Sequence, residues 1–325
     1  MQIFRSIDEI PANFGPSVVT IGNFDGVHRG HQAVIADVIE RARALHARSV
    51  AVTFDPHPVR VLQPQVPLRL IDGLDEKLTL LKKTGIDAVL VLPFTRTLSR
   101  LTALEFAREI LSSALGAVEV QEGENFRFGA DARAGIHDLA ALGEQFGFVA
   151  RVHRPIVWRG IEVSSSVVRA AIAEGNMRAA RQLLGRPFEI YSTPAVGLGY
   201  GAHYTVPTIN LALYRELVPA NGVYITCIDV NGEAFHAVTN VGNRPTFGKP
   251  SFAIETHILD FHPIALDDNS QLRLRFLDRM RDEVEWPSPE ALKEQIGRDI
   301  ARARHYFGLY QNVYWAAAEK MNPRL

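Results

Sequence analysis

The sequence has little cysteine, no excess of charge of one sign and no long apolar run. Cys227 is the one cysteine among 325 residues, which excludes an internal disulfide and a multi-cysteine zinc site and suggests a reducing compartment. The 35 Lys and Arg residues balance 36 Asp and Glu residues, so no overall field attracts nucleic acid or anionic lipid. Any affinity for phosphate must therefore be local.

The chain also lacks a segment that would target it to a membrane. Its start, MQIFRSIDEIP, has acids and a proline where a signal peptide needs an apolar stretch, and no apolar run of about 18 residues follows. We therefore expect a cytoplasmic protein that binds neither membrane nor nucleic acid, as a monomer or weak homo-oligomer. With 47% hydrophobic residues, the chain is long enough for two domains.

The first half alternates between patterns typical of strands and of helices. The apolar run 17–21 is followed by apolar residues at helical spacing over about 30–45 and by a second run at 49–54. Strand, helix, strand over this length predicts parallel strands joined by a right-handed crossover. Further strands are expected at 87–94, 117–123 and 146–155, with a helix at 102–115 whose Thr102 and Glu105 have capping-box spacing. The prediction is a doubly wound α/β layer.

The pattern changes after the segment RAARQLLGRPFEI, so we place a domain boundary between residues 186 and 187. Strands are expected at 222–230 and 233–242 around the hairpin signal Asn231-Gly232, and again at 251–261 and 271–277. Ser288 and Pro289 open a final helix that carries Leu292, Ile296 and Ile300 on one face. A small antiparallel β-barrel with a C-terminal helix fits residues 187–325.

The stretch GNFDGVHRGHQ, residues 22–32, directly follows the first predicted strand. Ligands of open α/β sheets bind at the carboxyl ends of strands, where a helix N-terminus offers N–H groups to an anion. Glycines permit close backbone approach, and His28 and His31 are spaced to project toward one point. Two such donors suit a phosphorus centre whose negative charge grows during attack. The alternatives are that these histidines cap the helix or bind a structural metal, although zinc would need another ligand.

A second candidate anion site lies in VSSSVVRAAI, residues 163–172. Ser164, Ser165 and Ser166 open a predicted helix and Arg169 follows one turn later, so hydroxyls, N–H groups and a guanidinium converge. Such a group suits a leaving pyrophosphate. The alternative is a set of serine caps with a surface arginine.

These motifs carry a family resemblance over nearly the whole chain. TIGNFDGVHRGHQ, FDPHP, GENFRFG and SSSVVR, in this order, resemble the N-terminal half of bacterial bifunctional riboflavin kinase/FAD synthetases, and LLGRPF falls where that family joins its halves. The first motif is typical of the HxGH nucleotidyltransferase group. That motif alone serves nicotinamide, pantetheine and glycerol nucleotidyl transfers equally well, so flavin enters only through the resemblance.

The resemblance implies roles for individual residues of the first half. His28 and His31 would contact the ATP phosphates, and Ser164, Ser165 and Arg169 would hold the triphosphate tail, with Ser166 standing where the family has threonine. Four further implied binding residues lie in the same loop as the histidines: Gly22, Asn23, Phe24 and Gly30. Phe54 and His57 would border the flavin, and Asn125 would lie near nucleotide or flavin. For FDPHP and Asn125 the alternative is an ordinary turn.

The second half resembles the riboflavin kinase domain, a six-stranded barrel, in VPTINL, NVGNRPTFG and IETHILDF. The resemblance implies that Thr208 and Asn210 hold the magnesium nucleotide and that Glu255 is the base that activates the ribityl hydroxyl. Turn residues and an exposed strand carboxylate are the alternatives.

One loop of the second half departs from the family pattern. In GLGYGAHYTVPTIN the glycines Gly197, Gly199 and Gly201 remain, so the backbone can still surround phosphates. The expected arginine is replaced by Ala202 and a later glycine by Thr205, which removes charge and flexibility. His203 is the residue that could restore part of the charge.

The leading hypothesis is an enzyme with two activities: it forms FMN from riboflavin and ATP, then FAD and pyrophosphate from FMN and ATP, with Mg²⁺ accompanying ATP in both steps. A narrower alternative is an FMN adenylyltransferase whose barrel only binds flavin or nucleotide. A second is a non-catalytic flavin- or nucleotide-binding sensor.

Overall fold

The computed structural model describes residues 1–195, 208–246 and 249–320. It divides the chain into two compact units, Met1–Arg169 with Leu183–Gly185 and Ala170–Gln182 with Arg186–Leu325. Within the described ranges, no helix combines the length and the apolar character needed to span a bilayer.

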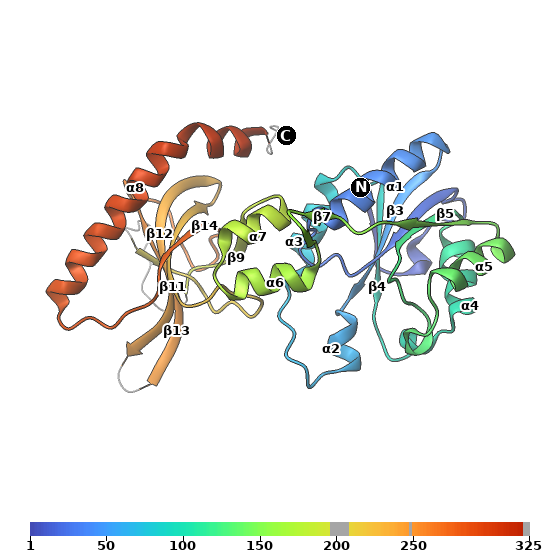
Figure 1. The fold of residues 1–325 in the computed structure, drawn as a ribbon, viewed down its shortest axis with the longest axis horizontal. Coiled ribbons are helices and arrows are strands. Elements are labelled where there is room, and N and C mark those ends of the chain that lie inside the picture. Colours follow the sequence, from blue (N-terminus) through green and yellow to red (C-terminus); the bar gives the residue numbers. More distant parts are fainter. Residues whose placement is uncertain (196–207, 247–248, 321–325) are drawn as a thin grey trace. The chain divides into compact units, whose positions relative to one another are not determined.

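The first unit is built on a six-stranded parallel sheet (Figure 1). In spatial order its strands are β1 (Gln2–Phe4), β4 (Ala88–Pro93), β3 (Arg48–Asp55), β2 (Ser17–Ile21), β5 (Ala117–Gly123) and β6 (Val149–His153). Strand β2 pairs with β3 on one side and with β5 on the other. The chain order therefore reverses at β2, which is where open α/β sheets bind their ligands.

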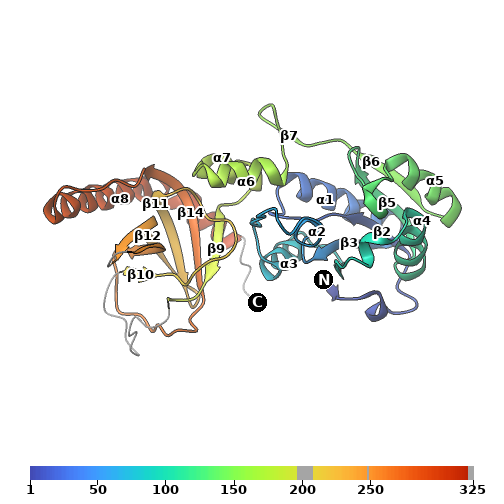
Figure 2. The ribbon, with the colours of Figure 1, turned by 90° about the horizontal axis from the view of Figure 1, so that it is seen from below.

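Helices cover both faces of this sheet, which confirms the predicted doubly wound layer (Figure 2). Helices α1 (Arg29–Ala44) and α3 (Leu74–Lys83) bury Ile35, Leu78 and Leu81 against one face. On the other face lie α4 (Ala103–Phe106), the π-helical segment Ala107–Ala114 and α5 (Ile136–Phe146). Apolar side chains on both sides explain why the central strands are continuous apolar runs.

Two elements differ from the prediction. The helix expected at 102–115 begins with the predicted capping box, in which the Thr102 hydroxyl accepts from the Glu105 N–H at 3.2 Å, but it continues from Ala107 as a π-helix. The strand expected at 146–155 starts only at Val149, because Phe146 ends α5 and Gly147 adopts a φ of 84° that stops the helix.

The other elements of the first half are short. They are α2 (Pro58–Leu62), the hairpin β7 (Val157–Trp158) and β8 (Ile161–Glu162), α6 (Ser165–Ala173), α7 (Met177–Leu184) and the 3₁₀ turns Ile7–Glu9, Leu98–Arg100 and Ala130–Ala132. Helix α7 ends directly before Gly185, which has a φ of 76°.

The second unit contains a curled antiparallel sheet of six strands, as the sequence predicts. Their order is β10 (Thr208–Asn210), β13 (Lys249–Ile258), β12 (Glu233–Thr246), β11 (Gly222–Val230), β14 (Leu272–Arg281) and β9 (Phe188–Ser192). Backbone hydrogen bonds from Ala195 to Asn210 and from Ala212 to Thr193 join the continuations of the two edge strands. Asn231 and Gly232, at φ 52° and 91°, form the predicted two-residue hairpin turn.

The C-terminal helix α8 (Pro289–Lys320) begins where predicted, and the Ser288 hydroxyl accepts a hydrogen bond from the Ala291 N–H at 3.2 Å. The predicted stripe is confirmed only at Ile300, which packs against the core of the second unit. Leu292 and Ile296 stay 41% and 42% exposed, whereas Ala303 and Phe307 are buried.

A ladder of three buried hydroxyl groups connects the strands of the second sheet. The Thr239 hydroxyl lies 2.8 Å from that of Thr226 on β11 and 3.0 Å from that of Thr256 on β13, and all three residues are fully buried. A buried hydroxyl that loses its partner destabilises the fold. The ladder therefore fixes β13 against its neighbours.

We expect Thr239→Val to lower the free energy of unfolding by about 1–3 kcal/mol, because it leaves two buried hydroxyls without this partner. The triple variant Thr226→Val, Thr239→Val, Thr256→Val removes the polar groups together and should recover part of the loss. Denaturant midpoints measure both effects. A triple variant less stable than the single one would contradict this account.

Candidate active site

The turn between β2 and α1 has an unusual backbone. Phe24, Gly26 and Val27 have φ values of 47°, 85° and 35°. Positive φ suits glycine but is rare for other residues and especially for a β-branched one. Strain of this kind is concentrated at functional sites and needs support from its surroundings.

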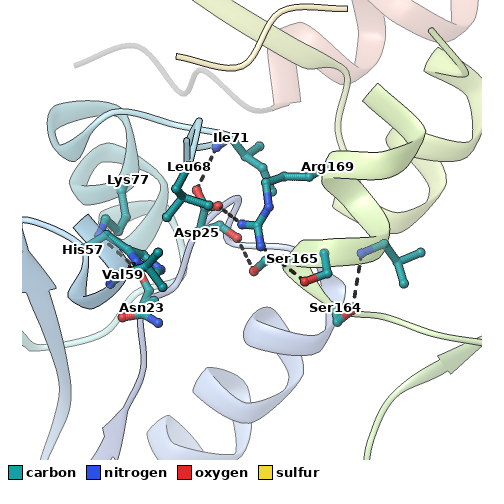
Figure 3. A network of polar contacts seen from close by, with 12 residues as sticks. Asn23, Asp25, His57, Val59, Leu68, Ile71, Lys77, Ser164, Ser165 and Arg169 are labelled. Atoms are coloured by element: carbon teal, nitrogen blue, oxygen red, sulfur yellow. Dashed lines mark hydrogen bonds and ion pairs between the residues drawn. The ribbon is translucent and has the colours of Figure 1, made fainter. Parts of the chain in front are cut away.

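Asp25 provides that support (Figure 3). Its carboxylate, only 3% exposed, accepts a hydrogen bond from the Ile71 N–H at 2.8 Å and pairs with Arg169 at 2.6 Å. Its backbone carbonyl accepts from the Ser165 hydroxyl at 2.9 Å. Burial raises the pKa of Asp25, while the Ile71 N–H and Arg169 oppose this rise. The turn is thus bound to α6, which carries the second predicted anion site.

The two histidines of the first motif lie face to face at the start of α1. Their ring centroids are 3.7 Å apart with planes inclined by 17°, and the edge of Phe24 meets His31 at 5.1 Å. His28 also caps the helix, because its Nδ1 accepts from the His31 N–H at 3.4 Å. A Cβ on Gly30 would come within 3.1 Å of the His28 ring and 3.2 Å of the Val163 carbonyl, so a larger residue would require these neighbours to shift.

Both imidazoles are neutral at neutral pH. Burial lowers the pKa of His28 to about 4, helped by the charge of Arg169. Burial, with the charges of His28 and Lys77, also lowers the pKa of His31 well below its usual range. Because Nδ1 of His28 is an acceptor, its proton resides on Nε2, which can donate to a ligand. His28 therefore acts as a hydrogen-bond donor without a positive charge.

Two buried polar atoms of this turn have no hydrogen-bond partner within the described ranges. They are Nδ1 of His31 and Oδ1 of Asn23. Buried polar atoms are nearly always paired, and exceptions require an explanation such as a ligand. These two atoms indicate a polar ligand at the end of β2.

The predicted serine and arginine group is brought to the same place. The Ser164 hydroxyl accepts from the Val167 N–H at 3.4 Å and so caps α6. Ser165 bonds the Asp25 carbonyl, and Arg169 reaches the Ser166 hydroxyl at 3.3 Å as well as the Asp25 carboxylate. The alternative of serine caps with a surface arginine therefore holds only for Ser164, because Arg169 is held by Asp25 and Ser166.

The residues expected to border the flavin are distributed around the same strand ends. His57 caps α2 by accepting from the Val59 N–H at 3.2 Å, and burial, with Lys77 and Arg169, lowers its pKa to about 4. Phe54 in β3 meets Phe94 edge-on at 5.5 Å. Gly22 donates to the Val52 carbonyl. The exposed Asn125 lies in the turn after β5 and has no contact with the histidine pair in the described structure.

Sequence reasoning missed one buried cation of the site. Lys77 reaches in from α3, is 5% exposed, and donates to the Asn23 carbonyl at 3.1 Å and to the Thr53 hydroxyl at 3.4 Å. The available signal was its place between Leu74 and Leu78 on the apolar face of a helix that was not predicted.

The candidate kinase residues meet across two strands of the second unit. On β10 and β13, Thr208 lies opposite His257 and Asn210 opposite Glu255, and the Thr208 hydroxyl is 3.3 Å from Nδ1 of His257. The residues Gly197, Gly199, Gly201, Ala202, His203 and Thr205 lie outside the described residues. No cluster of three or more His, Cys, Asp or Glu side chains suited to a metal occurs in the described structure.

Comparison with known proteins agrees with this division of the chain. Residues 10–167 match the family model for FAD synthetase and residues 184–307 that for riboflavin kinase. A bifunctional riboflavin kinase/FMN adenylyltransferase of Pseudomonas fluorescens is 37% identical over 94% of this chain and 97% of its own, and one of Escherichia coli K12 is 34% identical over 95% and 99%. A crystal structure described as a macrolide-efflux protein from Streptococcus pneumoniae has a TM-score of 0.81 at 28% identity, covering 93% of this chain and 98% of its own.

The neutral histidines make stability depend on pH. Unfolded histidine titrates near pH 6.5, whereas folded His28 titrates at about 4, so between these values the unfolded chain binds more protons. The contribution of His28 to stability is complete above pH 6.5 and is lost as pH falls toward 4, by roughly 3 kcal/mol at most. We expect His28→Asn, which retains a capping side chain, to weaken this dependence.

Calorimetric unfolding of both proteins between pH 7 and pH 4.5 measures the effect. The difference between them isolates His28 from carboxylates that titrate in the same range. An identical pH dependence in wild type and variant would contradict the neutral state of His28.

Proposed function

The chain belongs to the family of bifunctional riboflavin kinases/FMN adenylyltransferases, and we propose that the histidine pair and the β10–β13 strand pair are its two active sites. The protein is a transferase with both activities. One half transfers a phosphoryl group from ATP to riboflavin and gives FMN. The other transfers the adenylyl group of ATP to FMN and gives FAD and pyrophosphate.

The stacked imidazoles carry the assignment of the adenylyltransferase site. In this reaction an oxygen of the FMN phosphate attacks the α-phosphorus of ATP, so the site has to hold the groups in line and stabilise charge. His28 offers its Nε2–H beside the N-terminal N–H groups of α1. Arg169, held by Asp25, and Ser165 lie at the start of α6, where they suit the β- and γ-phosphates that leave as pyrophosphate.

The strand register supports the kinase site. The carboxylate of Glu255 would accept the proton of the attacking ribityl hydroxyl, and Thr208 and Asn210 would hold the nucleotide with its Mg²⁺. Hydroxyl, amide and carboxylate oxygens are the hard ligands that Mg²⁺ prefers, and the ion would neutralise phosphate charge when bound.

We also propose that residues 1–186 form the adenylyltransferase domain and 187–325 the kinase domain. The gap between the two matched ranges, after 167 and before 184, supports a boundary in this region. Packing assigns Ala170–Gln182 to the second unit, so α6 belongs partly to each packing unit. A cytoplasmic location, a monomeric or weakly oligomeric state and the absence of nucleic-acid or membrane partners remain predictions.

Two substitutions should separate the activities. With riboflavin, ATP and Mg²⁺, His28→Ala should accumulate FMN, while its rate of FAD formation falls by about a hundredfold to a thousandfold, as for loss of one aligned donor. Glu255→Gln should form no FMN from riboflavin but convert supplied FMN to FAD at the wild-type rate. Chromatography of the flavins measures both.

Wild-type FAD formation in His28→Ala would refute the assignment of the histidine pair. A wild-type protein that makes FAD from FMN but no FMN from riboflavin would favour the narrower alternative, an adenylyltransferase with a binding barrel.

Chelation with EDTA should stop both reactions, and added Mg²⁺ should restore them.

A further inference from the structure

The buried ammonium of Lys77 has no part in the function described so far. Figure 3 shows Lys77 grouped with His57 and Asn23, while Asp25, Ser165 and Arg169 lie across the site. Its two hydrogen-bond acceptors, the Asn23 carbonyl and the Thr53 hydroxyl, are neutral. An ammonium has three N–H donors, so these contacts leave one donor for a ligand.

The positive charge of Lys77 is not paired at contact distance. In the part of the chain that the structure describes, no carboxylate forms an ion pair with its Nζ. The carboxylates of Asp25, Asp55 and Asp72 act on it from further away and oppose the lowering of its pKa by burial. A buried cation without a direct counter-ion is costly unless an anion is bound there during function.

Lys77 lies near both halves of the substrate site. Its charge lowers the pKa of His31, which lies in the first turn of α1, where we place ATP. Its charge also lowers the pKa of His57, which lies at the start of α2, beside the expected flavin. It also supports the carbonyl of Asn23, whose side-chain oxygen has no partner within the described ranges. The side chain is therefore placed where the two substrates have to meet.

The reaction needs a cation at such a place. The nucleophile is the FMN phosphate, itself an anion, and it must approach a triphosphate. A bond forms between the FMN phosphate oxygen and the α-phosphorus, and the bond from the α-phosphorus to the bridging oxygen breaks, its electron pair leaving with pyrophosphate. The FMN phosphate is already ionised, so the step needs charge neutralisation and no general base.

Resting on the proposed function, we propose that Lys77 is a catalytic residue of adenylyl transfer whose ammonium binds the FMN phosphate and holds it against the α-phosphorus of ATP. Its hydrogen bonds to Asn23 and Thr53 aim the Nζ, and its third donor contacts the phosphate. Arg169 binds the leaving side of ATP, so the two cations serve different phosphates.

The test measures initial rates of FAD formation in the full-length chain, varying FMN at saturating ATP and ATP at saturating FMN. Lys77→Met should raise KM for FMN at least tenfold and lower kcat, with KM for ATP within about twofold of wild type. Lys77→Gln keeps donors without charge and should show the same selectivity. Lys77→Arg keeps the charge and should restore part of the loss.

Lys83→Met is the matched control, because Lys83 is exposed on the same helix and should leave all constants unchanged. FMN formation from riboflavin and the calorimetric transitions check folding in every variant. Parallel changes in KM for FMN and ATP, or no change in either, would overturn the proposal in favour of a structural lysine. Retention of FAD formation by His28→Ala would instead refute the proposed site as a whole, so the two failures are distinguishable.

Discussion

The carboxylate of Asp25 holds the turn after β2 in a conformation that its own residues disfavour. Phe24 and Val27 pay a steric cost at positive φ, and the hydrogen bond from Ile71 together with the ion pair to Arg169 offsets it. The same contacts place the start of α1 at the carboxyl end of β2 and bring α6 beside it. Helix termini, imidazoles and guanidinium are thus assembled around one side chain.

Burial makes some basic residues of the site neutral and leaves others positively charged. Desolvation keeps His28 and His31 neutral, so they provide directed hydrogen bonds without adding charge. Positive charge is left to Lys77 and Arg169, one on α3 and one on α6. In the proposed reaction, neutral donors would approach the reacting phosphorus closely, while the two cations would balance substrate charge from either side.

The sequence predicted elements whose signals are local. Strand β2 was predicted with its observed bounds and α1 within about one residue, because a short apolar run and a helical stripe are separated by glycines and a capping histidine. Helix α3 was not predicted because Lys77 interrupts its apolar face. Helix α5 was not predicted because Gly143 and Gly147 weaken the helical pattern. Both helices are stabilised by packing against the sheet rather than by their own propensities.

The residues of the candidate site that lie in local motifs could likewise be predicted from the sequence. His28, His31, Ser165 and Arg169 stand in compact motifs, and the structure brings them together. The role of Asp25 and the contacts of Lys77 depend on residues far apart in the chain. Local spacing marks Lys77 only as a charged residue on an apolar helix face and does not reveal what it contacts. Helix capping and ligand binding were also framed as alternatives for His28, whereas one ring nitrogen can do the first and leave the other for the second.

The proposed kinase site depends on strand register rather than on a strained turn. Residues directly opposite in an antiparallel pair share a face, and alternate residues of one strand return to it. Thr208, Asn210, Glu255 and His257 therefore lie on one face of β10 and β13, with Asn240 of β12 opposite Glu255. The intervening Thr256 turns to the other face and joins the buried hydroxyl ladder. A slip of one residue would bury Glu255 and expose Thr256, so the core contacts of Thr256 determine where Glu255, the proposed base, points.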